Sequence, residues 1–310
     1  MNTVLCIGEA LVDMICTDSE KSLFQGVHFI KKCGRSSTSI AIALTAIGGK
    51  VINIACVGDD PFGEFIFNTL KEFKVNTDYI FIDKKSYTTM AYVSLKKDNT
   101  KDLYFQRGAD GNIRIRDIQK IDLNTVAIFY FGSVTAFLEG DLFFTYLYLL
   151  KYTKEHKKFI YFDPSYRALL FKDNTDYFIK NCNEFLAHAH LIKMTLDEAL
   201  LISKQTNIND ALTYFATFVK GNMIILLDNK DEILYYSPHN KSQQIISNKQ
   251  LIGIDSTGSC DNFVATLLYH ISLLPSEDLL HISIDQLMHF TFKDDVINTN
   301  ICTYFPTSFN

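Results

Sequence analysis

Short apolar runs alternate with amphipathic segments along most of the chain. The apolar runs predict buried strands at 4–8, 51–57, 126–132, 158–163, 190–193 and 223–227, the last of them paired to 232–236. The segments between them predict helices at 36–48, within 58–75, at 140–155, 174–186 and 196–203, and from about 260 onward. Strands that are separated by helices are typical of a parallel sheet with helices on both faces.

Two segments show a different pattern. Within 17–32 and 86–106, β-branched and aromatic residues alternate with polar ones, which is typical of antiparallel strands with one face in water. The stretch KDNT at 97–100 supplies a hairpin turn. Because such strands do not fit inside a parallel sheet, we expect one domain over 1–310 with a small β-sheet lid, whose strands lie within about 10–33 and 86–106.

Composition and charge exclude several classes of protein. The chain is 47% hydrophobic and 21% charged, and its net charge of −5 provides no basic field to hold nucleic acid or an anionic membrane. The seven cysteines are scattered without a C-x-x-C pair, which argues against a zinc site or a disulfide framework. The amino-terminal segment lacks the features of a signal peptide, and no apolar stretch reaches the roughly 18 residues of a membrane helix. The sequence therefore predicts a cytoplasmic protein with no nucleic-acid or membrane partner.

Two common nucleotide-binding motifs do not occur. A P-loop ending at Gly49 and Lys50 would need a glycine at position 44, and that residue is Leu44. The dinucleotide motif G-x-G-x-x-G would follow the first strand, where the sequence reads GEALVD. Any nucleotide site must therefore be built in another way.

The segment GIDSTGSCDNF at 253–263 carries the strongest chemical signal. A turn of small residues leads into an apolar helix, and Asp261 lies at the start of that helix. Free backbone N–H groups and the positive end of the helix dipole favour an anion there. A carboxylate beside such a site can accept a proton from a hydroxyl group while the amides stabilise a phosphoryl group. A plain helix-capping role for Asp261 is the alternative, and it is equally open at this point.

The same segment resembles the signature D-T-x-G-A-G-D-x-F of the ribokinase-like (PfkB) carbohydrate kinases. The resemblance places the catalytic base at Asp261 and the anion hole at Gly258, Ser259 and Cys260. Further segments resemble the fructokinases of that family, in the family's order and over most of the chain: GEALVDMI, GDDPFGEFIFNTLKEFKV, FGSVTAFLEG, IYFDPSYR and KMTLDEAL.

This resemblance implies a fold, a reaction and a set of site residues. The fold is a three-layer α/β ribokinase-like fold with a mainly parallel central sheet, helices on both faces and a small β-sheet lid. The reaction is ATP- and Mg²⁺-dependent transfer of the γ-phosphoryl group to a sugar hydroxyl, with fructose the favoured sugar. The implied substrate-binding residues are Asp13, Gly34, Ser39, Arg107, Asp163 and Arg167. The implied nucleotide-binding residues are Thr195, Asn229, Asp255, Thr257 and Gly258, and Glu198 is implied to orient magnesium through water. The lid is expected either to close the site of its own subunit or to pair in a homodimer.

Several positions depart from the family's motifs. Arg35 and Ser39 stand where the family has a glycine and an asparagine in the sugar pocket, and Cys260 replaces a glycine. Thr195 replaces the asparagine of N-x-x-E, and 227–232 lacks the motif T-x-G-x-x-G. These departures support a second hypothesis, in which a kinase fold without turnover is kept as a binding or scaffold protein. Asp261 favours a working kinase, because a protein without turnover has least reason to keep the catalytic base.

His188 and His190 form a separate pair in the segment AHAHLIK. Their spacing of two places both on one face of a strand, which is compatible with a metal site. No carboxylate or cysteine accompanies them within the segment, so surface or core histidines are the favoured interpretation.

Overall fold

The structure is a computed structural model of the 310-residue chain. It describes residues 1–34, 37–97, 100–132, 134–227, 232–247 and 259–291, and of 247, 259 and 260 it describes the backbone alone. In the part of the chain that it describes, no helix is long and apolar enough to cross a membrane.

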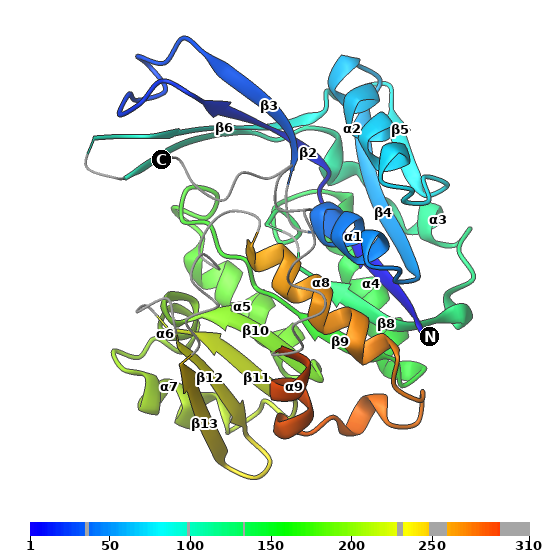
Figure 1. The fold of residues 1–310 in the computed structure, drawn as a ribbon, viewed down its shortest axis with the longest axis vertical. Coiled ribbons are helices and arrows are strands. Elements are labelled where there is room, and N and C mark those ends of the chain that lie inside the picture. The colour runs from blue at the N-terminus through cyan, green and yellow to red at the C-terminus, as the bar shows by residue number, and fades with distance from the viewer. Residues whose placement is uncertain (35–36, 98–99, 133, 228–231, 248–258, 292–310) are drawn as a thin grey trace.

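A nine-stranded sheet forms the centre of the molecule, in the order β13-β12-β11-β10-β9-β8-β1-β4-β5 (Figure 1). The strands are β1 (Thr3–Ile7), β4 (Val51–Gly58), β5 (Ile80–Asp83), β8 (Val126–Phe131), β9 (Phe159–Phe162), β10 (Leu191–Thr195), β11 (Asn222–Leu226), β12 (Glu232–Ser237) and β13 (Ser242–Ser247). All neighbours from β5 to β11 pair in parallel, and β12 and β13 add antiparallel. The predicted parallel sheet is confirmed, and so is the predicted pairing of β11 with β12.

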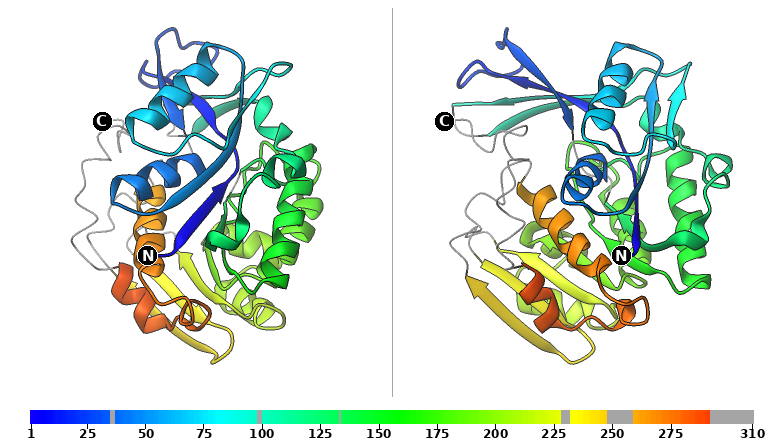
Figure 2. Two further views of the ribbon diagram at one scale, coloured as in Figure 1. Left: turned by 90° about the vertical axis from the view of Figure 1, so that its right-hand side faces the viewer. Right: turned by 45° about the vertical axis from the view of Figure 1, so that its right-hand side comes forward.

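Helices cover both faces of this sheet (Figure 2). On one face, α1 (Ser37–Ala46), α8 (Ser259–Ser272) and α9 (Ile284–Thr291) share a buried cluster with β1, β8, β9, β11 and β12. On the other face, the buried cluster contains side chains of α3 (Ile115–Ile118), α4 (Asp141–Glu155), α5 (Thr175–Leu186), α6 (Leu196–Ser203) and α7 (Ile208–Phe215). Burial on both faces explains why the central strands have continuous apolar sequences.

A second sheet of four strands forms the lid, in the order β3-β2-β6-β7. Its strands are β2 (Leu11–Cys16), β3 (Phe29–Gly34), β6 (Thr89–Leu95) and β7 (Lys101–Gln106). Both hairpins, β2–β3 and β6–β7, are antiparallel as expected. The two hairpins join through β2 and β6, however, and these strands are parallel. The expectation of a wholly antiparallel lid was wrong on this point, because alternating side chains give the same sequence pattern in either pairing direction.

The GDDPFG turn anchors the lid to the large sheet. Asp60 caps α2 (Pro61–Glu72) by accepting hydrogen bonds from the N–H groups of Phe62 and Gly63. The same carboxylate accepts the backbone N–H of Thr88 at 2.7 Å and its hydroxyl at 2.8 Å, directly before β6. The Thr88 hydroxyl oxygen in turn accepts the N–H of Gly58. This part of the fructokinase-like sequence therefore fixes the base of the lid.

Candidate active site at the carboxyl edge of the sheet

The residues that the sequence singled out gather where the parallel strands end, which we call the carboxyl edge. Asp163 directly follows β9, and Thr195 is the last residue of β10. β1 ends at Ile7, and after three residues the chain enters the lid at Leu11. The amino-terminal end of α8 points toward the side on which the lid lies (Figures 1 and 2). In open α/β sheets, ligands bind at this edge of the strands.

Tyr130 connects the two carboxylates of this edge. It lies on β8 and is 1% exposed. Burial raises the pKa of its hydroxyl well above the usual range, and the negative charges of Asp163 and Asp261 raise it further. Because Coulomb interactions weaken with distance, both carboxylates lie near this hydroxyl. The sequence gave no signal for Tyr130, which stands inside the apolar run VAIFYF.

The glycine of the F-G-S segment has a steric reason. A side chain at Gly132 would overlap the hydroxyl group of Tyr130. Gly132 therefore leaves room for the phenol ring to reach the carboxyl edge, where it contacts Tyr161 edge-on with ring centroids 5.4 Å apart.

Asp163 is part of a buried ion pair. Its Oδ2 atom accepts a hydrogen bond from Nζ of Lys193 at 2.9 Å, and both side chains are less than 10% exposed. Its Oδ1 atom accepts the hydroxyl of Ser165 at 3.1 Å. Lys193 belongs to the KMTLDEAL segment, but the sequence assigned it no role. Its partner becomes visible only when β9 and β10 are placed side by side.

The loop after Asp163 is bound to the neighbouring strand end by Glu198. The N–H of Tyr166 donates to Oε1 of Glu198 at 2.8 Å. Oε2 accepts the N–H of Thr195 at 2.9 Å, and the Thr195 hydroxyl accepts the N–H of Glu198, which completes a capping box at the start of α6. Thr195, a departure from the family's asparagine, is therefore a good helix cap. Arg167 donates to the backbone oxygen of Tyr166.

Asp13 and Gly34 form the lid's contribution. Asp13 is 4% exposed on β2, and a side chain at Gly34 on the neighbouring β3 would overlap its carboxylate. Lys32 faces Asp13 across the two strands, and burial lowers the pKa of Lys32 while the charge of Asp13 opposes that shift. Ser39 is buried in the first turn of α1.

The segment after β8 is held from two sides. Glu9, which is fully buried after β1, accepts the N–H of Val134 at 3.3 Å. Arg107, at the end of the lid, donates to the backbone oxygens of Thr135 and Glu139. The Nε atom of Arg107 also lies 3.4 Å from the carboxylate of the buried Asp110. The guanidinium group expected to bind substrate therefore joins the lid to the large sheet.

Some of the predicted site residues cannot be placed. Gly258, Asn229, Asp255 and Thr257 lie outside the described residues, as does Arg35, and Ser259 and Cys260 are described by backbone alone. Within the described residues, the structure brings Asp163, Arg167, Thr195, Glu198 and Asp261 to the carboxyl edge, with Asp13 and Gly34 in the lid.

A magnesium ion has few protein ligands at this edge. No group of three or more acidic, histidine or cysteine side chains in the described ranges could hold a metal. Each carboxylate oxygen of Glu198 already accepts one backbone N–H bond, which leaves one lone pair on each for a metal-bound water. This donor set fits a magnesium ion that keeps its waters and takes most other ligands from phosphates.

Comparison with known proteins places the chain among sugar kinases. It is 27% identical over 267 residues to the probable fructokinase-5 of Arabidopsis thaliana, covering 86% of this chain and 81% of the relative. An uncharacterized sugar kinase of Pyrococcus horikoshii, solved in complex with ATP, superposes with a TM-score of 0.77 at 25% identity, covering 94% of this chain and 89% of the other. The fructokinase of Vibrio cholerae O395 with fructose, ADP and calcium shares the fold, with a TM-score of 0.74, 22% identity and coverage of 94% and 91%.

The family description "pfkB family carbohydrate kinase" matches residues 1–281. This match spans the large sheet, the lid and α8, and the chain therefore belongs to the pfkB family of carbohydrate kinases.

Proposed function

We propose that the protein transfers the γ-phosphoryl group of ATP to a hydroxyl group of a sugar, with fructose the first candidate. The observation that carries this proposal is the position of Asp261 in the first turn of α8, near Tyr130 and Asp163. The relatives support the choice of ligands, since one neighbour was solved with ATP and another with fructose and ADP.

Asp261 acts as the general base in this proposal. It accepts the proton of the attacking hydroxyl as the oxygen approaches the γ-phosphorus atom. The backbone amides of Gly258, Ser259 and Cys260 stabilise the charge on the transferred group, as donors at a helix amino-terminus do. Because phosphoryl transfer depends mainly on positioning and charge neutralisation, these groups supply most of the chemistry.

Asp13 and Ser39 hold the sugar, and Asp163 and Arg167 line the site beside it. The steric contact between Asp13 and Gly34 supports this assignment, because it fixes the carboxylate on a rigid pair of strands. We assign Arg107 a positioning role, since its Nη atoms donate to the backbone of the 135–139 segment.

Thr195, Asn229, Asp255 and Thr257 are proposed to contact the nucleotide. Magnesium, bound mainly by the nucleotide's phosphates, neutralises their charge, and Glu198 orients one of its waters through a remaining lone pair. Nothing in the described residues favours the scaffold alternative, since Asp13, Asp163 and Glu198 are all buried in ordered contacts.

An assay over a panel of sugars tests the function. Purified protein with Mg-ATP should phosphorylate fructose or a related sugar, and Asp261→Asn should lower turnover by about 10²–10⁴-fold. Asp176→Asn is the matched control, because Asp176 also lies in the first turn of a helix but is 85% exposed. Background ADP production by the wild-type protein with every sugar would contradict the proposal.

We also propose that the lid pairs with a second copy. Register places Ile30, Ile15, Val93 and Leu103 in one row across the lid, on the face that carries Asp13. Ile30 is 41% exposed there.

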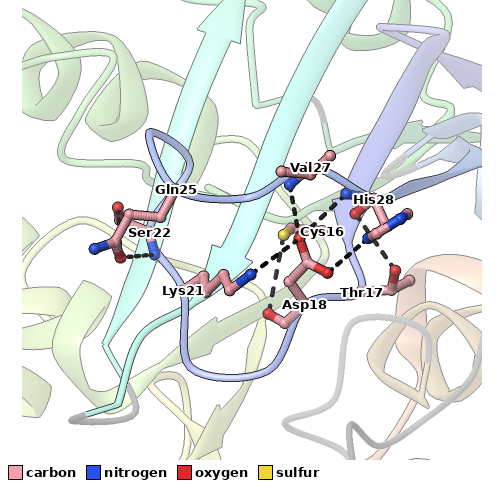
Figure 3. Close-up of polar contacts among 8 residues, drawn as sticks. All are labelled: Cys16, Thr17, Asp18, Lys21, Ser22, Gln25, Val27 and His28. Atoms are coloured by element: carbon pink, nitrogen blue, oxygen red, sulfur yellow. Dashed lines mark hydrogen bonds and ion pairs between the residues drawn. The ribbon is translucent and has the colours of Figure 1, made fainter.

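The tip of the lid is ordered and apolar. The carboxylate of Asp18 accepts the backbone N–H groups of Val27 and His28 and contacts the ring of His28 at 2.9 Å (Figure 3). This loop presents Phe24 and Val27 at 97% and 73% exposure. Sedimentation should show a dimer that Ile30→Asp and Phe24→Asp weaken, and a monomer at all concentrations would remove this claim.

A cytoplasmic location is the last part of the proposal. The cysteines at 6, 16, 33, 56 and 182 are free and buried, which suits a reducing compartment. Thiol titration of denatured protein that was purified without reductant should find all seven cysteines reduced. A lower count would contradict the proposed compartment.

A further inference from the structure

A cavity of about 840 Å³ lies at the opposite edge of the sheet, where β9, β10 and β11 begin. Its floor is formed by buried apolar side chains, among them Ile160, Ala189, Leu279 and Ile282. The cationic and imidazole side chains that line it are Lys154, Lys157, Lys220, His188, His239 and His281. The cavity is distinct from the candidate active site, since roughly 13–16 Å of strand separate the two edges along β9 and β10.

The electrostatic character of this cavity differs from that of the whole chain. The chain has a net charge of −5, but three lysines and one aspartate line the cavity. That aspartate, Asp285, accepts a hydrogen bond from Gln244 at 3.5 Å. Glu184 lies outside the lining, at 55% exposure and 3.8 Å from Lys154. An anion that enters the cavity therefore meets mainly positive charge.

The contacts of His188 show that these charges converge. Nζ of Lys154 lies 2.7 Å from Nε2 of His188, so the ammonium group donates to a neutral imidazole. Burial lowers the pKa of His188, and the charges of Lys154 and Lys220 lower it further. Lysines from α4 and from the loop before β11 thus act on the same point. An anion placed there would take over the hydrogen bond of Lys154 and relieve this repulsion.

Two simpler explanations account for less. A metal site is excluded among the described residues, where no three histidine, cysteine or acidic side chains could hold an ion. Basic residues also complement helix carboxyl ends, and α4 and α5 end at Glu155 and Leu186 near this cavity. Each helix end carries only about half a negative charge, which is less than the three lysines supply together.

We propose that this cavity binds a small organic molecule that carries a phosphate group. Lysine ammonium groups and the amides of Asn222 and Asn240 suit phosphate oxygens. A volume of about 840 Å³ is in the range of ligand pockets, and the apolar floor leaves space for an organic body beyond the phosphate. Nothing in the proposed phosphoryl transfer uses these residues.

Calorimetric titration of the full chain tests this inference, with inorganic phosphate, fructose 6-phosphate and AMP as separate probes. The double variant Lys154→Ala/Lys220→Ala removes two converging charges. Lys50→Ala/Lys84→Ala removes the same number of exposed lysines elsewhere and is the matched control. We expect at least one organic phosphate to bind, and the cavity variant to lose about tenfold or more in affinity through the loss of charged donors. The control should bind as the wild type does.

The three probes separate the sources of binding. Tighter binding of an organic phosphate than of inorganic phosphate supports a pocket for the whole molecule. Equal affinity of the cavity variant and the wild type for every probe would place the binding elsewhere, including the active site, and would overturn the inference. So would the absence of binding by all three probes at millimolar concentration. Melting temperatures of both variants show that the substitutions leave the fold intact.

Discussion

The Nζ atom of Lys193 lies 2.9 Å from Oδ2 of Asp163, and this ion pair is almost completely buried between the ends of β10 and β9. Removing two charges from water costs several kcal/mol each, so such a pair contributes little net stability by itself. It holds a carboxylate at the carboxyl edge in a fixed orientation, with Ser165 on its other oxygen atom. We infer that Lys193 is a positioning residue for Asp163.

Replacement of the lysine alone should be costly. Lys193→Met leaves Asp163 buried without its cation and should lower the free energy of unfolding by about 3–5 kcal/mol, measured by urea denaturation. Lys180→Met, at an exposed lysine of α5, is the control and should change stability by less than about 0.5 kcal/mol. The double variant Lys193→Met/Asp163→Asn should regain part of the loss. If Lys193→Met alone is as stable as the wild type, the ion pair does not control this edge.

Glu198→Gln separates a structural role from a role in magnesium binding. The amide group keeps only one acceptor for the two N–H groups of Tyr166 and Thr195, so stability should fall by about 1.5–3 kcal/mol. If Glu198 also orients a metal-bound water, the Mg²⁺ concentration for half-maximal rate should rise. An unchanged magnesium dependence with lowered stability would assign Glu198 a structural role alone. Glu184→Gln, at an exposed position on α5, is the matched control.

The sequence predicted most of the large sheet and its helices because their patterns are local. Continuous apolar runs such as VAIFYF identify buried strands wherever they pair. β13 was missed, since SQQIIS is too polar to stand out, and α9 was not identified. The parallel join of β2 and β6 was also beyond the sequence, because alternation carries no pairing direction.

The candidate site was predictable only where a motif carried it. Asp13, Asp163, Glu198 and Asp261 came from the resemblance, and the structure adds what surrounds them. Lys193 and Tyr130 lie within strands, and their relevance depends on neighbours that are distant in sequence. The capping role of Thr195 was open to local reading, because Thr195 and Glu198 have the spacing of a capping box.

Ser165 adopts a left-handed backbone conformation in the loop between Asp163 and Glu198's partner Tyr166, with φ of +51°. Serine is unfavourable there, whereas asparagine visits this region more readily. The family's motif F-D-P-N-x-R has asparagine at this position. Ser165→Asn should therefore raise stability by up to about 1 kcal/mol, read as a higher melting temperature, with kinase activity retained. Ser165→Val should lower stability, since a β-branched residue is strained at positive φ. A drop in melting temperature for Ser165→Asn would contradict this prediction.

His190 should make the protein sensitive to mild acid. Burial lowers its pKa to about 4, with contributions from the charges of His188 and His281, and its Nδ1 accepts the N–H of Ile160 at 3.1 Å. The unfolded chain binds a proton near pH 6.5 and the folded protein does not, so stability is complete above pH 6.5 and falls as the pH drops toward 4. The full loss is on the order of 3 kcal/mol. His190→Asn keeps an acceptor for the Ile160 N–H but cannot titrate, so its unfolding free energy should depend less on pH across this window. His289→Asn, at an exposed histidine of α9, is the control and should follow the wild type. Equal pH dependence of the wild type and His190→Asn would show that other groups cause the acid sensitivity.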